Sequence, residues 1–475
     1  MFRKTQSHNG TAGFVSSKAS GISSNHTPTE IREEMRKRTL AKHNATMQKL
    51  LCSCSVVLVI VLISPVLYVL CTRLGLGSLF PYQGEFIQAE PLLPDTALEI
   101  VAELPMPPGN IAVSSNGRIF FSFHPEFGPA DIKVAELKTK TTYKAFPNEE
   151  FQNRLATCLS MRIDRQDRLW LLDFNHHGIK GDPVLYAFAL KKRDILVKEI
   201  PLGTNLAGFG SMLNDFQVDP SGEFIYIADT GIVSTTPSLI VYSLKDDYGY
   251  RILDSHPSMY GQSTFINVGG STVQYGPFGL TINVDSITLD RSGSKLYYGA
   301  LTSDHLYSIS TSHLLHYLRT SNESFTDQEI LNIQMPQRVN LVLNNKPITD
   351  GITTDMNGNI YMTAIEHHSI AIAIPIKIKT EKLSFVSEKE SFQLYKLIQN
   401  NELLRWPDGL CFGNDGLYIT NSALHLKFTG QDYKHHTPYH ILKISNTKLK
   451  QGLNEIVLSE SSKKGINFVV PPAGH

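Results

Sequence analysis

Acidic and amide side chains recur at one position of a repeated sequence pattern, and their chemistry suits the binding of cations. Asn214, Asp285, Asp350 and Asp408 each stand at the start of an alternating apolar run. A polar turn, usually with a glycine, and a second β-rich run follow, which together indicate a β-hairpin. Carboxylate and amide oxygens are the ligands of hard cations such as Ca²⁺, and an acidic pocket also attracts organic cations.

The hairpin pattern occurs six times, and this number predicts the architecture. Aligned on the turn, the copies begin at these positions: Gly109, Leu159, Asn214, Asp285, Asp350 and Asp408. The repeat is one supersecondary unit with room for four strands, and it cannot bury its own faces alone. We therefore expect an all-β fold, a six-bladed β-propeller over residues 101–462.

The two ends of each hairpin predict where a site would lie. If the first strand of each blade is innermost, its starting residue points into the mouth of the central channel. The ends of the second strands share that edge and supply further rim candidates, which are His124, Asp173, Asp229, Glu366 and Asn421. An acidic mouth is therefore predicted. The alternative is that these are ordinary turn residues, as in the Pro-Asp-Gly sequence around Asp408.

An acidic mouth is compatible with two kinds of site. Converging oxygens could hold Ca²⁺, which would polarise a carbonyl for attack by water. The mouth could instead bind an organic cation, with aromatic side chains such as Phe174, Tyr275 or Phe278 against it. The histidine pairs at 176–177 and 367–368 lack the spacing of zinc ligands. The sequence contains no nucleophile elbow, phosphate loop or dinucleotide fingerprint.

Charge and hydropathy predict a membrane anchor near the N-terminus. The 44 basic and 44 acidic residues balance, which argues against a nucleic-acid partner. Residues 50–72 contain no charged side chain and are long enough to cross a bilayer as a helix. Five cations lie shortly before this span, namely Arg36, Lys37, Arg38, Lys42 and Lys49, whereas Arg73 is the only nearby cation after it. The positive-inside rule then predicts a single-pass type II membrane protein whose propeller is luminal or extracellular.

The remaining segments follow from this topology. Residues 1–49 are expected to be a basic, largely disordered cytosolic tail, residues 73–100 a stalk, and residues 463–475 a C-terminal tail. Asn322 is the one glycosylation sequon beyond the anchor. Cys158 and Cys411 lie in non-neighbouring repeats, so we expect no disulfide between them.

Several of these stretches resemble the yellow / major royal jelly protein family. They include MRIDRQDRLWLLD from Met161, LNDFQVDPSGEFIYIADTG from Leu213 and RWPDGL from Arg405. The resemblance implies a six-bladed propeller, with dopachrome conversion in some members and binding of biogenic amines in the central pocket in others. A more remote likeness to calcium-dependent lactonases of the gluconolactonase type implies Ca²⁺ at the four inner positions.

The prediction is a membrane-anchored propeller that binds a small polar or cationic molecule at the acidic mouth of its channel. One alternative is a Ca²⁺-dependent, lactonase-like hydrolase that uses Asn214, Asp285, Asp350 and Asp408. A second alternative is a non-catalytic platform for protein interactions. The identity of the ligand, a catalytic role and the oligomeric state are left open by the sequence.

Overall fold

A computed structural model describes residues 33, 37, 41, 89–262, 264–275, 278–320, 335–376 and 391–454. The chain divides into two units, Met1–Cys71 and Thr72–His475, and the described fold belongs to the second. No helix within the described ranges is both long and apolar enough to cross a bilayer. The predicted anchor at 50–72, most of the tail and stalk, Asn322 and residues 463–475 lie outside these ranges and stay predictions.

The described residues of the second unit form six four-stranded antiparallel sheets, each with the same order of strands. The innermost strands are β2 (Pro108–Val113), β6 (Cys158–Ile163), β10 (Leu213–Val218), β17 (Val284–Leu289), β21 (Ile352–Thr354) and β25 (Pro407–Phe412). The second strands are β3 (Ile119–Phe123), β7 (Arg168–Asp173), β11 (Phe224–Asp229), β18 (Lys295–Ala300), β22 (Ile360–Ala364) and β26 (Gly416–Asn421). The third strands are β4 (Val134–Leu137), β8 (Val184–Ala189), β12 (Ser238–Ser243), β19 (Leu306–Ser310), β23 (Ser369–Ile376) and β27 (Tyr439–Ser445). The outermost strands are β5 (Tyr143–Ala145), β9 (Ile195–Pro201), β13 (Tyr248–Ile252), β20 (Asn340–Leu343), β24 (Ser391–Gln399) and β1 (Leu98–Leu104).

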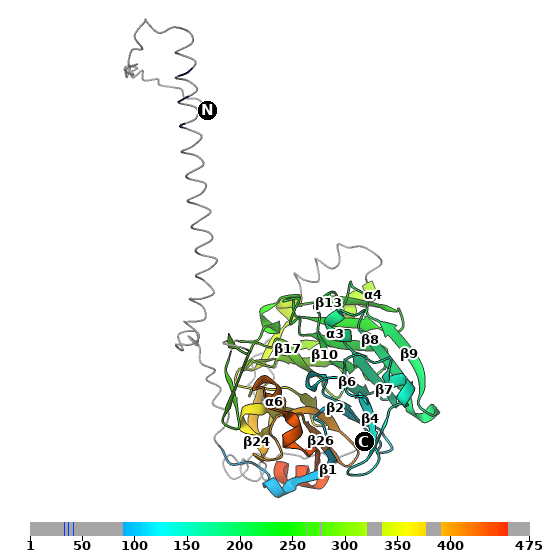
Figure 1. Ribbon diagram of the computed structural model, residues 1–475, viewed down its shortest axis with the longest axis vertical. Coiled ribbons are helices and arrows are strands. Elements are labelled where there is room, and N and C mark those ends of the chain that lie inside the picture. Colours follow the sequence, from blue (N-terminus) through cyan, green and yellow to red (C-terminus); the bar gives the residue numbers. More distant parts are fainter. Residues whose placement is uncertain are drawn as a thin grey trace, which may run out of the picture. The chain divides into compact units, whose positions relative to one another are not determined.

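The six sheets form a closed ring, which confirms the predicted propeller. Each innermost strand contacts the innermost strands of two neighbouring sheets, in the cyclic order β2, β6, β10, β17, β21 and β25. Figure 1 shows β2, β6, β10 and β17 in the middle of the unit and β1, β9, β13 and β24 towards its edge. We number the sheets as blades 1 to 6 in that order.

Blade 6 is built from both ends of the propeller. Strand β1 is its outermost strand and pairs antiparallel with β27, from Leu98 opposite Ile444 to Leu104 opposite Tyr439. The ring is therefore closed by hydrogen bonds between the first and the last strand. The propeller begins at Leu98, within the segment predicted to be stalk.

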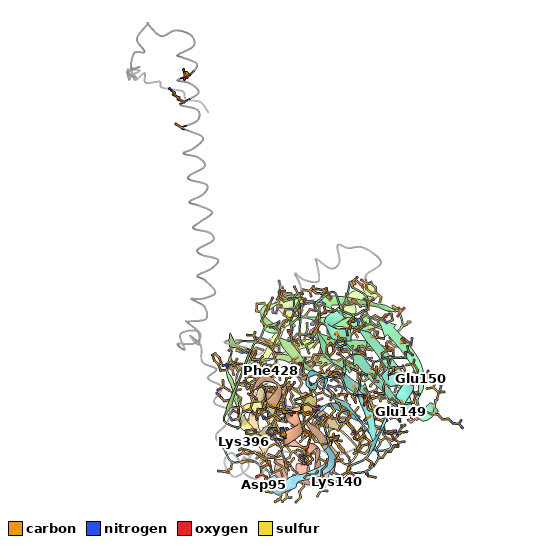
Figure 2. All side chains as sticks on the ribbon, viewed as in Figure 1. Asp95, Lys140, Glu149, Glu150, Lys396 and Phe428 are labelled. Atoms are coloured by element: carbon orange, nitrogen blue, oxygen red, sulfur yellow. The ribbon has the colours of Figure 1, made fainter. Side chains whose placement is uncertain are left out.

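Apolar side chains fill the space between neighbouring blades. Trp170 of β7, for example, packs in one buried cluster with Phe216 of β10 and Ile227 of β11. Every residue of β11 and β26 is buried, because each of these strands has a sheet face against a neighbouring blade on both sides. Charged side chains such as Lys140, Glu149 and Glu150 lie at the edge of the unit (Figure 2).

Hydroxyl groups join the blades around the channel. Ser122 of β3 donates to the carbonyl of Leu159 at 2.7 Å, and Ser286 of β17 donates to the carbonyl of Asp350 at 2.7 Å. Ser160 bonds the carbonyl of Asn214 in the same way. These bonds link the start of an inner strand in one blade to the neighbouring blade, so they fix the positions of the candidate residues.

A three-stranded insertion and several short helices lie outside the blades. The insertion consists of β14 (Ile266–Val268), β15 (Ser271–Tyr275) and β16 (Phe278–Gly279), between blades 3 and 4. The α-helices within the described ranges of this unit are α2 (Glu149–Gln152), α3 (Asn175–Gly178), α4 (Thr311–Thr320) and α6 (His425–Phe428). The 3₁₀ turns are η1 (Asp95–Ala97), η2 (Pro125–Phe127), η3 (Leu190–Lys192), η4 (Pro257–Met259), η5 (Met335–Arg338), η6 (Ile365–His367) and η7 (Tyr433–His436). Strand β14 contacts η6 of blade 5, and β15 contacts α6 of blade 6.

Candidate functional site

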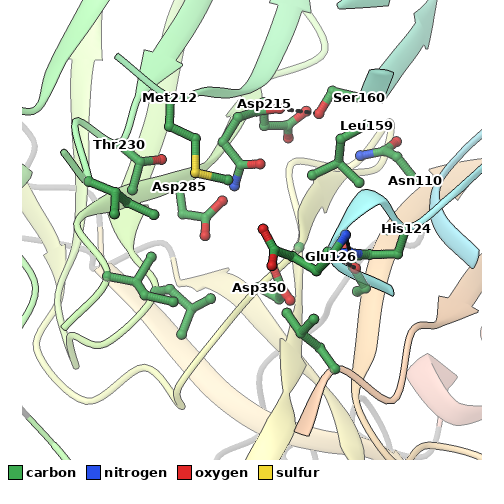
Figure 3. A pocket seen from close by; sticks show the side chains of 18 of the residues that line it. Asn110, His124, Glu126, Leu159, Ser160, Met212, Asp215, Thr230, Asp285 and Asp350 are labelled. Carbon is green, nitrogen blue, oxygen red and sulfur yellow. Dashed lines mark hydrogen bonds and ion pairs between the residues drawn. The ribbon is translucent and has the colours of Figure 1, made fainter. Parts of the chain in front are cut away.

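The four inner-strand candidates line one pocket at the mouth of the channel. Asn214, Asp285, Asp350 and Asp408 come from blades 3, 4, 5 and 6, and they surround a cavity of about 650 Å³. Figure 3 shows Asp285 and Asp350 at this cavity, with Asp215 and His124 on other sides of it. Side chains that are far apart in the sequence therefore meet at one opening.

Irregular pairing at the start of the inner strands increases the number of side chains that reach the pocket. The pairing of β10 with β11 shifts register between Leu213 and Phe216, and similar shifts occur at the start of β2, β6, β17 and β25. A bulge breaks the alternation of side chains along a strand. As a result Asn214 and Asp215 both line the pocket, as do Leu159 and Ser160.

Blades 5 and 6 approach each other closely at the acidic side of the pocket. A Cβ atom on Gly351 would lie 1.9 Å from the carbonyl oxygen of Asp408, so only glycine fits at this position. The hydroxyl of Thr363 accepts hydrogen bonds from the backbone N–H groups of Asp350 and Gly351 at 2.9 and 3.1 Å. The close approach is what brings Asp350 and Asp408 together.

Burial and mutual repulsion raise the pKa values of the pocket carboxylates. Desolvation raises the pKa of Asp285 and Asp408 well above the usual range, and the charges of neighbouring carboxylates raise both further. Desolvation also raises the pKa of Asp350 to about 6, although a hydrogen bond from Trp406 opposes this shift. Three carboxylates that resist ionisation together form a site where a cation would be stabilised.

The cation that lines the pocket is already paired. Arg162 donates to Asp215 at 2.5 Å and to the side-chain oxygen of Asn110 at 2.7 Å, so it links blades 1, 2 and 3. Desolvation raises the pKa of Asp215, and the charge of Arg162 opposes this shift. Lys346 is buried close enough to Asp285 for that carboxylate to raise the pKa of the lysine, but burial has the larger effect and lowers the pKa of Lys346 to about 7.

Two other side chains approach the acidic residues. The indole nitrogen of Trp406 donates to Asp350 at 2.6 Å. His124 lines the pocket with its Nε2 atom 3.8 Å from a carboxylate oxygen of Asp408. Burial lowers the pKa of His124 to about 3, so this histidine is neutral at pH 7.

The other rim candidates do not line the pocket. Asp173 accepts from the backbone of Ala156 and Thr157, Asp229 from Met212, and Asn421 from Trp406. Each of these three side chains binds the backbone just before the inner strand of its own blade. It can do so because the end of the second strand lies beside the start of the first strand. Glu366 accepts instead from Asn267 of the insertion at 2.9 Å. A ligand role for these four residues is a prediction that the geometry does not favour.

Apolar side chains form the outer wall of the pocket. They come from the segment that follows the insertion, from α6 and from loops at the mouth of the channel, and they include Ile232, Val233, Ile282, Leu301 and Phe428. Phe174, one of the aromatic residues considered from the sequence, is buried against His177 and does not line the pocket. The side chains of Tyr275 and Phe278 lie outside the described part of the chain.

The chemistry of the donors suits Ca²⁺, but their spacing does not form a metal site. In the described residues, no three His, Cys, Asp or Glu side chains are placed to hold one ion. The Ca²⁺ site therefore stays a prediction. The two thiols, Cys158 and Cys411, are free, as expected.

Asn110, Asp215, Arg162, Lys346 and the insertion were not identified from the sequence. The signal for Asn110 and Asp215 was their place one residue after the aligned position, which becomes meaningful only when the bulge is known. Arg162 was recognisable as a charge inside an inner strand. Lys346 and the insertion had no signal in the repeat, because they lie between the repeated hairpins.

The fold and the pocket together define a class of protein, a six-bladed β-propeller with an acidic pocket of ligand size at one end of its channel. The chain belongs to the major royal jelly protein family, whose model matches residues 157–454, well over half of the chain. The resemblance seen in the sequence is thereby confirmed. None of the curated proteins compared with the chain matches it.

Solved structures of other propellers are similar to this chain only at low identity. A streptogramin B lyase is 15% identical, covers 73% of this chain and 96% of its own, and has a TM-score of 0.38. A calcium-binding regucalcin from Agrobacterium tumefaciens is 12% identical, with coverage of 75% and 96% and a TM-score of 0.43. A gluconolactonase from Xanthomonas campestris is 10% identical, with coverage of 73% and 89% and a TM-score of 0.42. These values carry no conclusion about what this chain binds.

Proposed function

We propose that this chain is a membrane-anchored propeller that binds a small organic cation, such as a biogenic amine, at the acidic mouth of its channel. The observation that carries the proposal is the convergence of Asp285, Asp350 and Asp408 in one cavity whose lining cation, Arg162, is already paired with Asp215. An ammonium group would relieve the repulsion between the carboxylates. The apolar wall would contact the rest of the molecule.

Binding can be tested by calorimetry of the full chain with dopamine, serotonin and tyramine. Asp408→Asn and Asp285→Asn keep the shape of the side chain but remove its charge. We expect each to weaken amine binding by about 10-fold to 100-fold, the effect of losing a hydrogen bond to a charged group. Asp131→Asn is the matched control, because Asp131 is exposed and does not line the pocket. If no amine binds the wild-type chain, the proposal fails.

The membrane anchor is part of the proposal, and it is supported by the uncharged span at 50–72 and the cations before it. A type II topology exposes the sequon at Asn322 to the lumen and leaves those at Asn9, Asn25 and Asn44 in the cytosol. Expression in a glycosylating cell should therefore give a glycan that the Asn322→Gln substitution removes completely. A glycan that persists in this variant would contradict the topology.

The alternatives give different outcomes in parallel measurements. A Ca²⁺-dependent, lactonase-like hydrolase is favoured by the four oxygen-bearing residues in the pocket, and it predicts stoichiometric Ca²⁺ together with EDTA-sensitive lactone hydrolysis. A platform for protein interactions predicts neither amine binding nor turnover. Amine binding that is insensitive to EDTA would favour the organic cation over both.

A further inference from the structure

The pocket continues into an exposed apolar rim on one side of the channel mouth. Ile232 and Val233 line the pocket, and yet they are 45% and 50% exposed. Phe209, on the loop beside them, is 72% exposed. Exposed apolar side chains are unremarkable singly, but a group that extends the wall of a pocket indicates a binding surface.

Backbone hydrogen bonds hold the rim in place. The loop after β11 carries Ile232 and Val233, and Ser234 in this loop donates to the carbonyl of Gly210 at 3.0 Å. Gly210 follows Phe209 directly and donates in turn to the carbonyl of His177 at 3.0 Å. The two loops are thus joined, so their apolar side chains form one surface before any ligand arrives.

The rim also lacks charge. Neither residues 202–212 nor residues 230–237 include any Asp, Glu, Lys or Arg. Asp215, Asp285 and Asp408 lie instead on inner strands and Asp350 just before one, and the further acidic lining residue, Glu126, lies on η2 of blade 1. A molecule that satisfies both surfaces must therefore carry a cationic group at one end and an extended apolar group at the other.

We infer that the ligand is an amphiphilic cation, whose ammonium group lies on the acidic floor and whose apolar chain runs outward over Ile232 and Val233 towards Phe209. This inference rests on the proposed function, because it uses the same carboxylates. To the proposed function, the inference adds how long the ligand is and where its polar and apolar parts lie. A small amine would leave the rim in water, whereas a chain of several carbons would cover it.

A series of unbranched primary amines tests the inference on the full chain, from propylamine through hexylamine to nonylamine. Affinity is expected to rise by about fourfold for each added methylene, as for the burial of a methylene group in an apolar site. Replacing both Ile232 and Val233 with serine should reduce this dependence, so that the loss is largest for nonylamine. Asp408→Asn should instead weaken all three amines by a similar factor.

Ile195→Ser is the matched control, because Ile195 is 56% exposed on β9 and does not line the pocket. This variant should bind all three amines as the wild type does. Equal affinity for all three amines would overturn the inference and leave the proposed function standing, whereas no binding of any amine would remove both. The double-serine variant could also keep the wild-type dependence on chain length but change its sedimentation coefficient. This result would assign the rim to contacts between copies of the chain and would also overturn the inference.

Discussion

At the scale of single residues, the ionisation of Asp350 controls the charge of the pocket. Its pKa of about 6 places its change of charge between mildly acidic and neutral solution. Asp285 and Asp408 have pKa values well above the usual range for the same physical reason, which is burial next to other carboxylates. The charge that attracts a cation therefore depends on pH.

Amine binding should strengthen as the pH rises from 5 to 7.5. Only a small fraction of Asp350 is ionised at pH 5 and nearly all of it at pH 7.5, so we expect affinity to rise by about tenfold. Calorimetry at the two pH values measures this change. In Asp350→Asn the rise should be smaller, and a wild-type affinity that falls with increasing pH would contradict the assignment.

The same carboxylate should destabilise the fold at neutral pH. Because the pKa of Asp350 is higher in the folded chain than the ordinary value of 3.8, the folded state binds more protons, and stability falls as the pH rises from about 4 to 6. Asp350→Asn avoids this loss, so its free energy of unfolding at pH 7.5 should exceed that of the wild type by roughly 3 kcal/mol. The difference should close at pH 4. A less stable variant at pH 7.5 would show that the bond from Trp406 requires the charged form.

At the scale of elements, the insertion and the segment that follows it line one side of the pocket, and the repeat does not supply them. Two contacts hold the insertion to blade 5: the N–H of Asn267 donates to Glu366 at 2.9 Å, and the N–H of Gly269 donates to Nε2 of His368 at 3.1 Å. The Nδ1 atom of His368 lies 3.1 Å from the carbonyl of Leu404. His368 must therefore be neutral, with its proton on Nδ1, to make both bonds.

Replacing His368 with alanine should loosen the insertion without unfolding the blades. Loss of one hydrogen bond of about 1 kcal/mol predicts that amide hydrogen exchange of residues 264–275 becomes about fivefold faster. Mass spectrometry of exchanged peptides measures this effect. His435→Ala is the control, because His435 is exposed on η7. Faster exchange spread evenly over the blades would indicate global destabilisation instead.

At the scale of elements it is clearest which features could be predicted from the sequence and which could not. The alternating runs and turns identified every inner hairpin, because local β-propensity and turn residues determine them. They placed Asp285, Asp350 and Asp408 in one pocket through the repeat alone. The bulges and the insertion depend on contacts between blades, so Asp215 and Ile282 could not be assigned to the pocket. Asp173 and Asp229 were placed at the right edge, but both accept hydrogen bonds from backbone N–H groups, and Asp229 also pairs with Arg251.

At the scale of the whole molecule, the stability of the ring depends on strand β1. Leu104 of β1 is 1% exposed and packs with Tyr439 and Ile441 of β27. Leu104→Ala should lower the free energy of unfolding by about 2–4 kcal/mol, as for other buried leucines. Glu99→Ala, on the same strand but partly exposed beside Lys443, should cost about 1 kcal/mol or less. Equal effects of the two substitutions in denaturant unfolding would show that β1 does not close the ring.

The pairing of the first strand with the last has a consequence for biosynthesis. A nascent chain can complete blades 1 to 5 as they emerge, but β1 has no partner until β27 has been made, more than 330 residues later. Throughout that interval an unpaired sheet edge is available to other chains, which is a known route to aggregation. A truncation within the last blade would therefore leave an open ring. We expect molecular chaperones to retain such truncated chains, so that they are not transported onward.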